Sequence, residues 1–113
     1  MYVVNRSALI VKLKKPYLDW INYVSDPHKY TLETINREHH VFLIPEHDTE
    51  DALEEIIEEM YMEIFDHELE SFSRDRTLWP KKQNLAMFRE WFDVQVHSMV
   101  LDACEEEIME EEW

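Results

Sequence analysis

The 113-residue sequence contains no glycine. A glycine-rich phosphate loop, a dinucleotide-binding fingerprint and a GxSxG nucleophile elbow each need glycine, either for a positive φ or for close approach of the backbone. None of these motifs can form here, which excludes most common nucleotide enzymes. Tight two-residue hairpins are also disfavoured, so we expect connections that are helical or longer.

Cysteine is almost absent. Cys104 stands alone, so the chain cannot form an internal disulfide, and this fits a reducing compartment. Residues 1–13 lack the basic start and the long apolar core of a signal peptide. The apolar runs are too short to span a bilayer. These features predict a cytoplasmic protein that does not insert into a membrane.

Basic residues are missing from the middle of the chain. No Lys or Arg occurs between Arg37 and Arg74, whereas residues 38–73 contain thirteen acidic side chains. Residues 105–113 contain six more, and the formal net charge is −15. Such a charge disfavours direct binding to nucleic acid or to an anionic membrane, because both are polyanions.

The apolar content is sufficient for a folded core. Hydrophobic residues make up 45% of the chain and include 4 Trp, 5 Tyr and 5 Phe, which argues against disorder. We expect one domain over residues 1–104, followed by an acidic C-terminal tail, 105–113. The tail is expected to be solvated, or else to form a short helix whose Ile108, Met109 and Trp113 touch the body.

A long amphipathic helix over residues 48–72 dominates the pattern. Asp48 is the expected N-cap residue, with Asp51 at the third helical position. Neither Gly nor Pro interrupts the stretch, and its apolar residues recur at helical spacing, at Leu53, Ile56, Ile57, Met60 and Ile64. The helix is therefore expected to pack one side against the rest of the domain.

Shorter elements surround this helix. The continuous apolar run at residues 8–11 predicts a strand in the centre of a sheet, buried on both faces. The polar connection 73–83 is expected to be pinned to the core by Leu78 and Trp79. The other expected elements are a helix over 16–24 stopped by Asp26-Pro27, a helix from a Thr31 cap through Arg37, a strand over 39–44, a helix over 85–92 capped by Asn84, and a strand over 94–101.

These elements define the expected fold class. Residues 94–101 also fit an extension of the preceding helix, but the alternation of Val with polar residues favours a strand. The sequence then predicts a small α+β domain of three strands covered by four helices, in the order β-α-α-β-α-α-β.

The acidic side of the long helix is the candidate binding surface. Six like-charge pairs at i,i+4 spacing lie within residues 48–72, and together they cost about 1–3 kcal/mol at low salt. Either this surface is merely solvated, or something basic lies against it, in this chain or in a partner. The residues predicted to bind a partner are Glu54, Glu55, Glu58 and Glu59.

Histidine and carboxylate residues on and near the same helix define a metal-binding alternative. Glu63, His67 and Glu70 share one helix face, and His47 and Asp51 lie near the helix start. Metal ions need several such donors converging on one point. Known two-metal helical bundles gather them from several helices, and here one helix offers them. No cofactor is predicted, and a metal carrier or metal-dependent hydrolase using these five residues stays an alternative.

Several stretches are similar to a known group of proteins. They are residues 5–12 (NRSALIVK), 16–20 (PYLDW), 44–48 (IPEHD), 78–80 (LWP) and 88–102 (FREWFDVQVHSMVLD). Together they resemble a family of small acidic bacterial proteins of uncharacterised function. This resemblance implies a bacterial protein, and it implies no activity and no catalytic residues.

The leading functional prediction is a non-enzymatic cytosolic interaction or regulatory protein. Its acidic helix face would bind a basic surface on a protein partner. No catalytic group is predicted, because the three Glu residues after Cys104 disfavour a thiolate and because His97 and Ser98 would point to opposite faces of a strand. Mimicry of nucleic-acid charge is a second alternative, and self-association into a homodimer is a further prediction.

Overall fold

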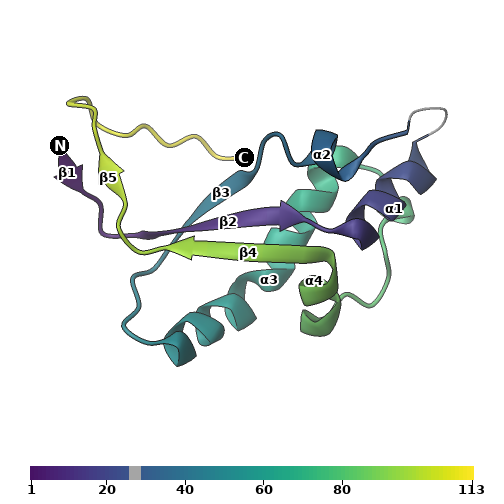
Figure 1. The fold of residues 1–113 in the computed structure, drawn as a ribbon, viewed down its shortest axis with the longest axis horizontal. Helices are drawn as coiled ribbons and strands as arrows, with labels where there is room; N and C mark the ends of the chain where they lie inside the picture. Colours follow the sequence, from purple (N-terminus) through teal and green to yellow (C-terminus); the bar gives the residue numbers. More distant parts are fainter. Residues whose placement is uncertain (26–28) are drawn as a thin grey trace.

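The computed structural model describes residues 1–25 and 29–113. Along these residues the elements follow one another as β1 (Tyr2–Val3), β2 (Ser7–Leu13), α1 (Lys15–Val24), α2 (Leu32–Ile35), β3 (His40–Ile44), α3 (Glu50–Phe72), the 3-10 helix η1 (Arg76–Leu78), α4 (Leu85–Trp91), β4 (Phe92–His97) and β5 (Leu101–Asp102) (Figure 1). The predicted α+β class is confirmed. From β2 to β4 the α-helices and strands follow the expected order.

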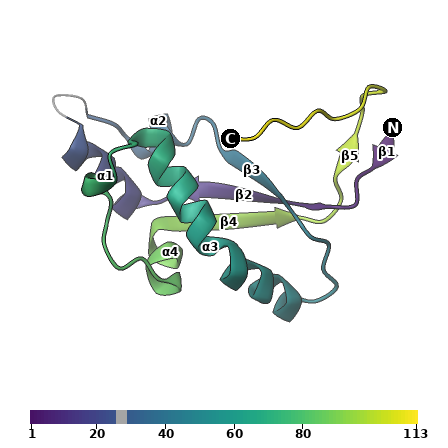
Figure 2. The same cartoon turned by 180° about the vertical axis from the view of Figure 1, so that it is seen from behind.

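A three-stranded antiparallel sheet in the order β3-β2-β4 forms the centre of the fold. β2 is the middle strand, as predicted, and its Ser7, Leu9 and Val11 are buried. The alternate residues Ala8 and Ile10 are only partly buried. The expectation that this strand is buried on both faces is therefore wrong, because α3 and α4 both lie on the same side of the sheet (Figures 1 and 2).

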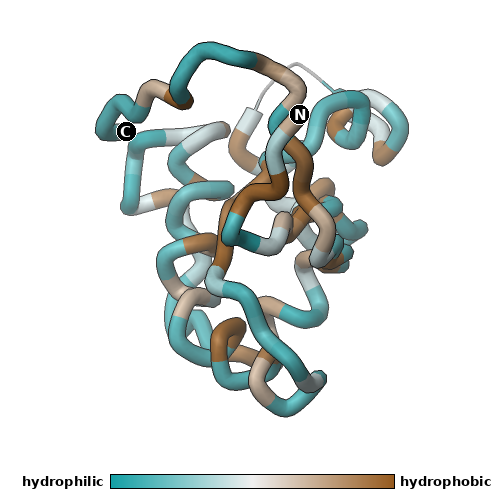
Figure 3. Tube along the Cα trace, turned by 90° about the vertical axis from the view of Figure 1, so that its left-hand side faces the viewer, coloured by the Kyte–Doolittle hydropathy of each residue, from teal (hydrophilic) through white to brown (hydrophobic). Residues whose placement is uncertain are grey.

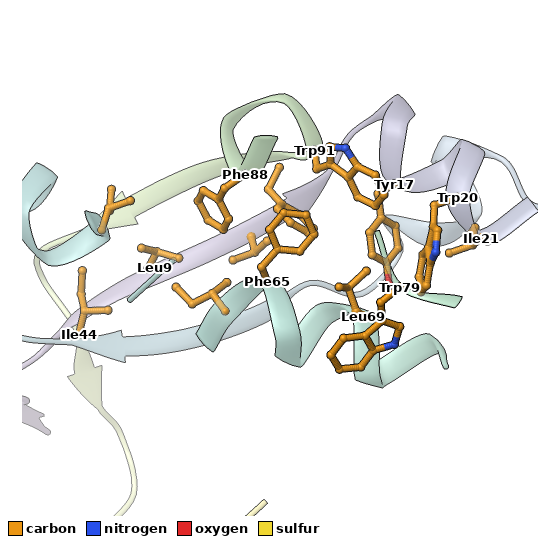
Figure 4. Packing of buried hydrophobic residues seen from close by; sticks show 14 residues of the cluster. Leu9, Tyr17, Trp20, Ile21, Ile44, Phe65, Leu69, Trp79, Phe88 and Trp91 are labelled. Atoms are coloured by element: carbon orange, nitrogen blue, oxygen red, sulfur yellow. The ribbon is translucent and has the colours of Figure 1, made fainter. Parts of the chain in front are cut away.

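The core lies between that side of the sheet and the helices. Hydrophobic residues concentrate along the strands, and hydrophilic residues surround them (Figure 3). Phe65 of α3 is fully buried and points toward the sheet beside Phe88 of α4 (Figure 4). Its ring centroid lies 5.0 Å from that of Phe92 and 5.4 Å from that of Trp91. These contacts between aromatic rings fix α3 and α4 to the start of β4.

Side-chain caps begin the α-helices α2, α3 and α4. The Thr31 hydroxyl accepts the Thr34 N–H in a capping box at α2, and the Asn84 side chain accepts the Met87 N–H at α4, both at predicted caps. α3 starts later than expected. Thr49, rather than Asp48, has the extended backbone of a cap, and its hydroxyl accepts the Ala52 N–H.

The segments that join the helices differ in part from expectation. α1 has Pro16 in its first turn and ends at Val24, and the predicted stop at Asp26-Pro27 lies outside the described residues. Trp79 is buried and pins the 73–83 connection, whereas Leu78 is 40% exposed. Leu78 contributes through its backbone instead, because its carbonyl oxygen accepts the Trp20 indole N–H at 2.8 Å.

The C-terminal region contains a strand pair that the sequence did not indicate. β4 begins at Phe92, directly after α4, which rules out the helical alternative for residues 94–97. β5 then pairs antiparallel with β1 in a separate two-stranded sheet. Residues 105–113 form no helix or strand and are exposed. The Trp113 ring nevertheless lies 4.5 Å from the ring of His67 on α3.

Truncation of Phe65 tests the aromatic core. Replacing this fully buried ring by alanine (Phe65→Ala) is expected to lower the free energy of unfolding by about 3–5 kcal/mol, because it leaves a cavity among the aromatic rings. Urea unfolding followed by tryptophan fluorescence measures the change. Met62→Ala on the same helix is the control. Met62 is 43% exposed, so its loss is expected to cost less than about 1 kcal/mol.

Candidate functional site

The four predicted partner-binding residues lie exposed on α3. Glu54 forms an ion pair with Arg89 of α4, with 2.6 Å between Oε2 and Nη2. Glu55, Glu58 and Glu59 make no ion pair with the described residues. One basic residue of the same chain therefore lies against the acidic surface, as one of the two alternatives predicted. Most of the acidic surface is open to solvent.

A shallow hollow of about 390 Å³ lies beside Glu54, between the first half of α3 and strand β4. Its apolar lining comes from Leu53, Ile57, Val94 and Val96. Its charged lining comes from Glu50, Asp51, Glu54 and Arg89. The acidic surface thus borders an apolar depression, which a partner side chain can enter.

The residues of the metal-binding alternative lie along different parts of α3 and its entry. The His47 ring contacts the Pro45 carbonyl oxygen at 3.4 Å, and Asp51 lines the hollow beside Glu54. Glu63, His67 and Glu70 lie near the C-terminal Trp113. Within residues 1–25 and 29–113, no group of three or more His, Cys, Asp or Glu side chains is placed to hold a metal ion. We propose no metal centre here.

A second site, which sequence reasoning missed, lies at the other end of α3. Glu68 is only 4% exposed, although it is ionisable. Its Oε1 lies 2.8 Å from Nδ1 of His40 on β3. Its backbone carbonyl oxygen accepts the buried Tyr17 hydroxyl at 2.7 Å. Glu68 therefore joins α3 to both β3 and α1.

Glu68 and His40 line a pocket of about 200 Å³, which we call the Glu68 pocket. The α2 region forms one side of it, and two asparagines hold that region in place. The Asn36 side chain accepts the Leu13 N–H and donates to the Leu13 carbonyl oxygen, both at 2.9 Å. The Asn22 side chain bonds the backbone N–H and carbonyl of Tyr30 in the same way.

The pKa values of two groups that line this pocket, Glu68 and Tyr17, and of the neighbouring His67 are shifted by their surroundings. Burial raises the pKa of Glu68, and the hydrogen bond and charge of His40 oppose that rise. Burial, and then the charge of Glu68, raise the pKa of the Tyr17 hydroxyl. Burial, and then neighbouring His40, lower the pKa of His67, whose ring lies 4.9 Å from that of His40. Perturbed ionisable groups beside a pocket are typical of functional sites.

The sequence does not single out Glu68, because it is one of many acidic residues along the helix and most of the others are solvated. Its position in the helical repeat is the one local feature that indicates burial. Residue 68 follows buried Ile64 by four and precedes Phe72 by four, so it falls within the apolar stripe of the helix. An acid at such a position needs a partner in the fold. That partner, His40, is 28 residues away in the sequence.

No protein-family model, curated protein or solved structure matches this chain. The resemblance to a family of small acidic bacterial proteins therefore stays a prediction. Among the described residues, no helix is both long and apolar enough to cross a bilayer. What can be said of function rests on the chain's own two surfaces, the acidic side of α3 and the Glu68 pocket.

Removal of the Tyr17 hydroxyl tests how much its hydrogen bond contributes to the stability of the protein. Tyr17→Phe is expected to lower the free energy of unfolding by about 1 kcal/mol at neutral pH, because a buried hydrogen bond to Glu68 is lost. Chemical unfolding of both proteins at one pH measures this difference. An unchanged free energy of unfolding would mean that the hydroxyl contributes no net stability.

The same pair of proteins is expected to differ in alkaline solution. The folded-state pKa of Tyr17 is raised above its ordinary value of 10.0, so the stability from the neutral hydroxyl is complete below pH about 10 and is lost as pH rises through the folded-state value. Unfolding at pH values from 8 upward, on the order of one unit apart, should show a steeper loss for the wild type than for Tyr17→Phe. Parallel curves would contradict this.

Proposed function

We propose that this chain is a non-enzymatic interaction or regulatory protein of the cytoplasm. Its Glu54, Glu55, Glu58 and Glu59 bind a basic surface on a protein partner. The observation that supports this proposal is an exposed row of carboxylates on α3, a helix that contains no Lys or Arg. Arg89 of α4 pairs with one of these carboxylates, that of Glu54. A partner would supply the remaining cations.

Electrostatic energy favours such a complex. Glu54 and Glu58, and likewise Glu55 and Glu59, are i,i+4 neighbours, and each like-charge pair costs about 0.2–0.5 kcal/mol in the free protein. A basic partner relieves this repulsion. Complementary charge also accelerates association. The contact between Arg89 and Glu54 shows the geometry in which a guanidinium meets this surface.

The apolar hollow beside Glu54 indicates which chemical features a partner surface should have. Basic residues alone would meet the carboxylates and leave the apolar lining, including Ile57 and Val94, in contact with water. A segment that combines Arg or Lys with an apolar side chain would cover both. Interfaces commonly place one apolar anchor in a depression and surround it with polar contacts. A basic amphipathic helix or loop of a partner protein therefore fits this region.

Charge removal on α3 tests the proposed surface. The protein with Glu54, Glu55, Glu58 and Glu59 all changed to Gln is expected to lose capture of partners from a cell lysate, because the carboxylates are gone while side-chain shape is kept. Capture by immobilised protein, followed by titration calorimetry with each recovered partner, measures this loss. For the wild type, affinity is expected to fall as salt is added, because salt screens the contacts.

The matched control removes four charges elsewhere. Glu33, Glu46, Glu90 and Asp93 are exposed and make no ion pair with the described residues, so their amide variants change the net charge equally. Equal capture by all three proteins would overturn the proposal. Heparin is added in a parallel capture. Displacement of partners that themselves bind nucleic acid would favour the charge-mimic alternative.

The same surface is expected to limit the stability of the free protein. The triple variant Glu55→Gln, Glu58→Gln and Glu59→Gln keeps the Glu54–Arg89 pair and removes four like-charge pairs, so it should be more stable by about 1–2 kcal/mol at low salt. Thermal and urea unfolding measure the gain. The gain should shrink at high salt, and a gain that is independent of salt would rule out relief of charge repulsion.

A further inference from the structure

The Glu68 pocket has the composition of a ligand site. Most of its wall is apolar, with aliphatic side chains from β2, α1 and α2 and the rings of Tyr17, Tyr30 and Phe72. The Tyr30 ring packs edge-on against the Phe72 ring, with 5.7 Å between centroids. An apolar wall with a few polar groups is typical of small-molecule sites. A volume of about 200 Å³ limits the occupant to a small molecule.

The charged residues that line the pocket determine whether it favours a cationic or an anionic ligand. Glu38 and Glu68 both line the pocket, whereas no Lys or Arg does. The other ionisable groups of the lining are His39, His40 and the two tyrosines. An anionic ligand would therefore meet two carboxylates without a permanently charged cation to balance it. The lining favours a cation.

The Glu68 carboxylate lacks a full set of partners. Oε1 bonds to His40, and Oε2 makes no hydrogen bond with the described residues. The side chain is 95% buried, but Oε2 is not among its fully buried atoms, so it stays accessible to a donor. A buried carboxylate that accepts only one hydrogen bond carries a desolvation cost that further donors would offset. Because Glu68 also lines the pocket, a ligand in the pocket can supply such a donor.

We propose that the Glu68 pocket binds a small organic amine in its ammonium form. The ammonium donates to Glu68 Oε2, and the apolar body of the amine packs against Leu13, Ile35 and the ring of Phe72. This site does not depend on the acidic surface at Glu54–Glu59, so it adds a second recognition function to the chain.

Three probes with one ring and different head groups test the proposal. Benzylamine, benzyl alcohol and benzoate are titrated separately into the isotope-labelled protein at neutral pH, and amide chemical shifts are followed. Benzylamine is expected to shift signals of residues that line the pocket and to bind at least about tenfold more tightly than the other two. Equal binding of all three would show an unselective apolar pocket, and no binding of benzylamine would overturn the proposal.

Two variants locate the site of benzylamine binding. Glu68→Gln keeps the side-chain shape and is expected to weaken benzylamine binding at least about tenfold, because the charge partner is lost. Since this variant also alters the bond to His40, Glu38→Gln serves as the second variant. Glu38 is exposed and makes no hydrogen bond with the described residues, so folding should be unaffected and binding should weaken severalfold.

The same titration includes a control variant, and it distinguishes the amine site from a purely structural role of Glu68. Glu33→Gln removes an exposed acid from the neighbouring helix α2 outside the pocket, and it should bind benzylamine as the wild type does. If Glu68 only ties α3 to β3, then Glu68→Gln will lower the melting temperature while benzylamine affinity stays the same in both pocket variants. That result would leave Glu68 as a structural group and overturn the amine site.

Discussion

The structure depends on the packing of one side of α3 against the sheet. This helix opposes its own formation, since its acids repel one another at i,i+4 spacing and no basic residue lies in its last turn. Burial of Ile57, Ile64, Phe65 and Leu69 supplies the opposing free energy. The aromatic rings from α4 and β4 that contact Phe65 therefore have a role beyond filling the core. They hold a self-repelling helix in place.

This constraint determines where the charges lie. Because one side of α3 must face the core, nearly all of its carboxylates are directed outward. Among residues 1–25 and 29–113, Arg89 alone pairs with one of them. Glu68 is the exception, buried within the apolar side and bonded to His40. A buried carboxylate needs such a partner, because leaving it without a hydrogen bond costs free energy. Glu68 thus joins the core to the wall of the Glu68 pocket.

Local chemistry accounts for what the sequence could predict. Helical spacing located α3 within two residues, Pro16 and Asn84 marked the starts of α1 and α4, and the apolar run at residues 8–11 identified the central strand. Features set by distant contacts, or by a choice between two neighbouring capping residues, were missed. Thr49 displaced Asp48 as cap by a difference of one residue, the β1–β5 pair involves two residues on each side, and the environment of Glu68 depends on His40 and Tyr17. None of these contacts leaves a periodic pattern in the chain.

The two proposed surfaces lie at different places along α3. Glu68 lies nine residues beyond Glu59, which corresponds to about 14 Å along a helix at 1.5 Å per residue. This exceeds the Debye length of about 8 Å at physiological ionic strength. Salt would screen most of the interaction between exposed charges at this separation, but it screens the buried Glu68 less. The packing of α3 is a second route for coupling between the two surfaces, because Phe65 lies between them in the sequence and is fully buried.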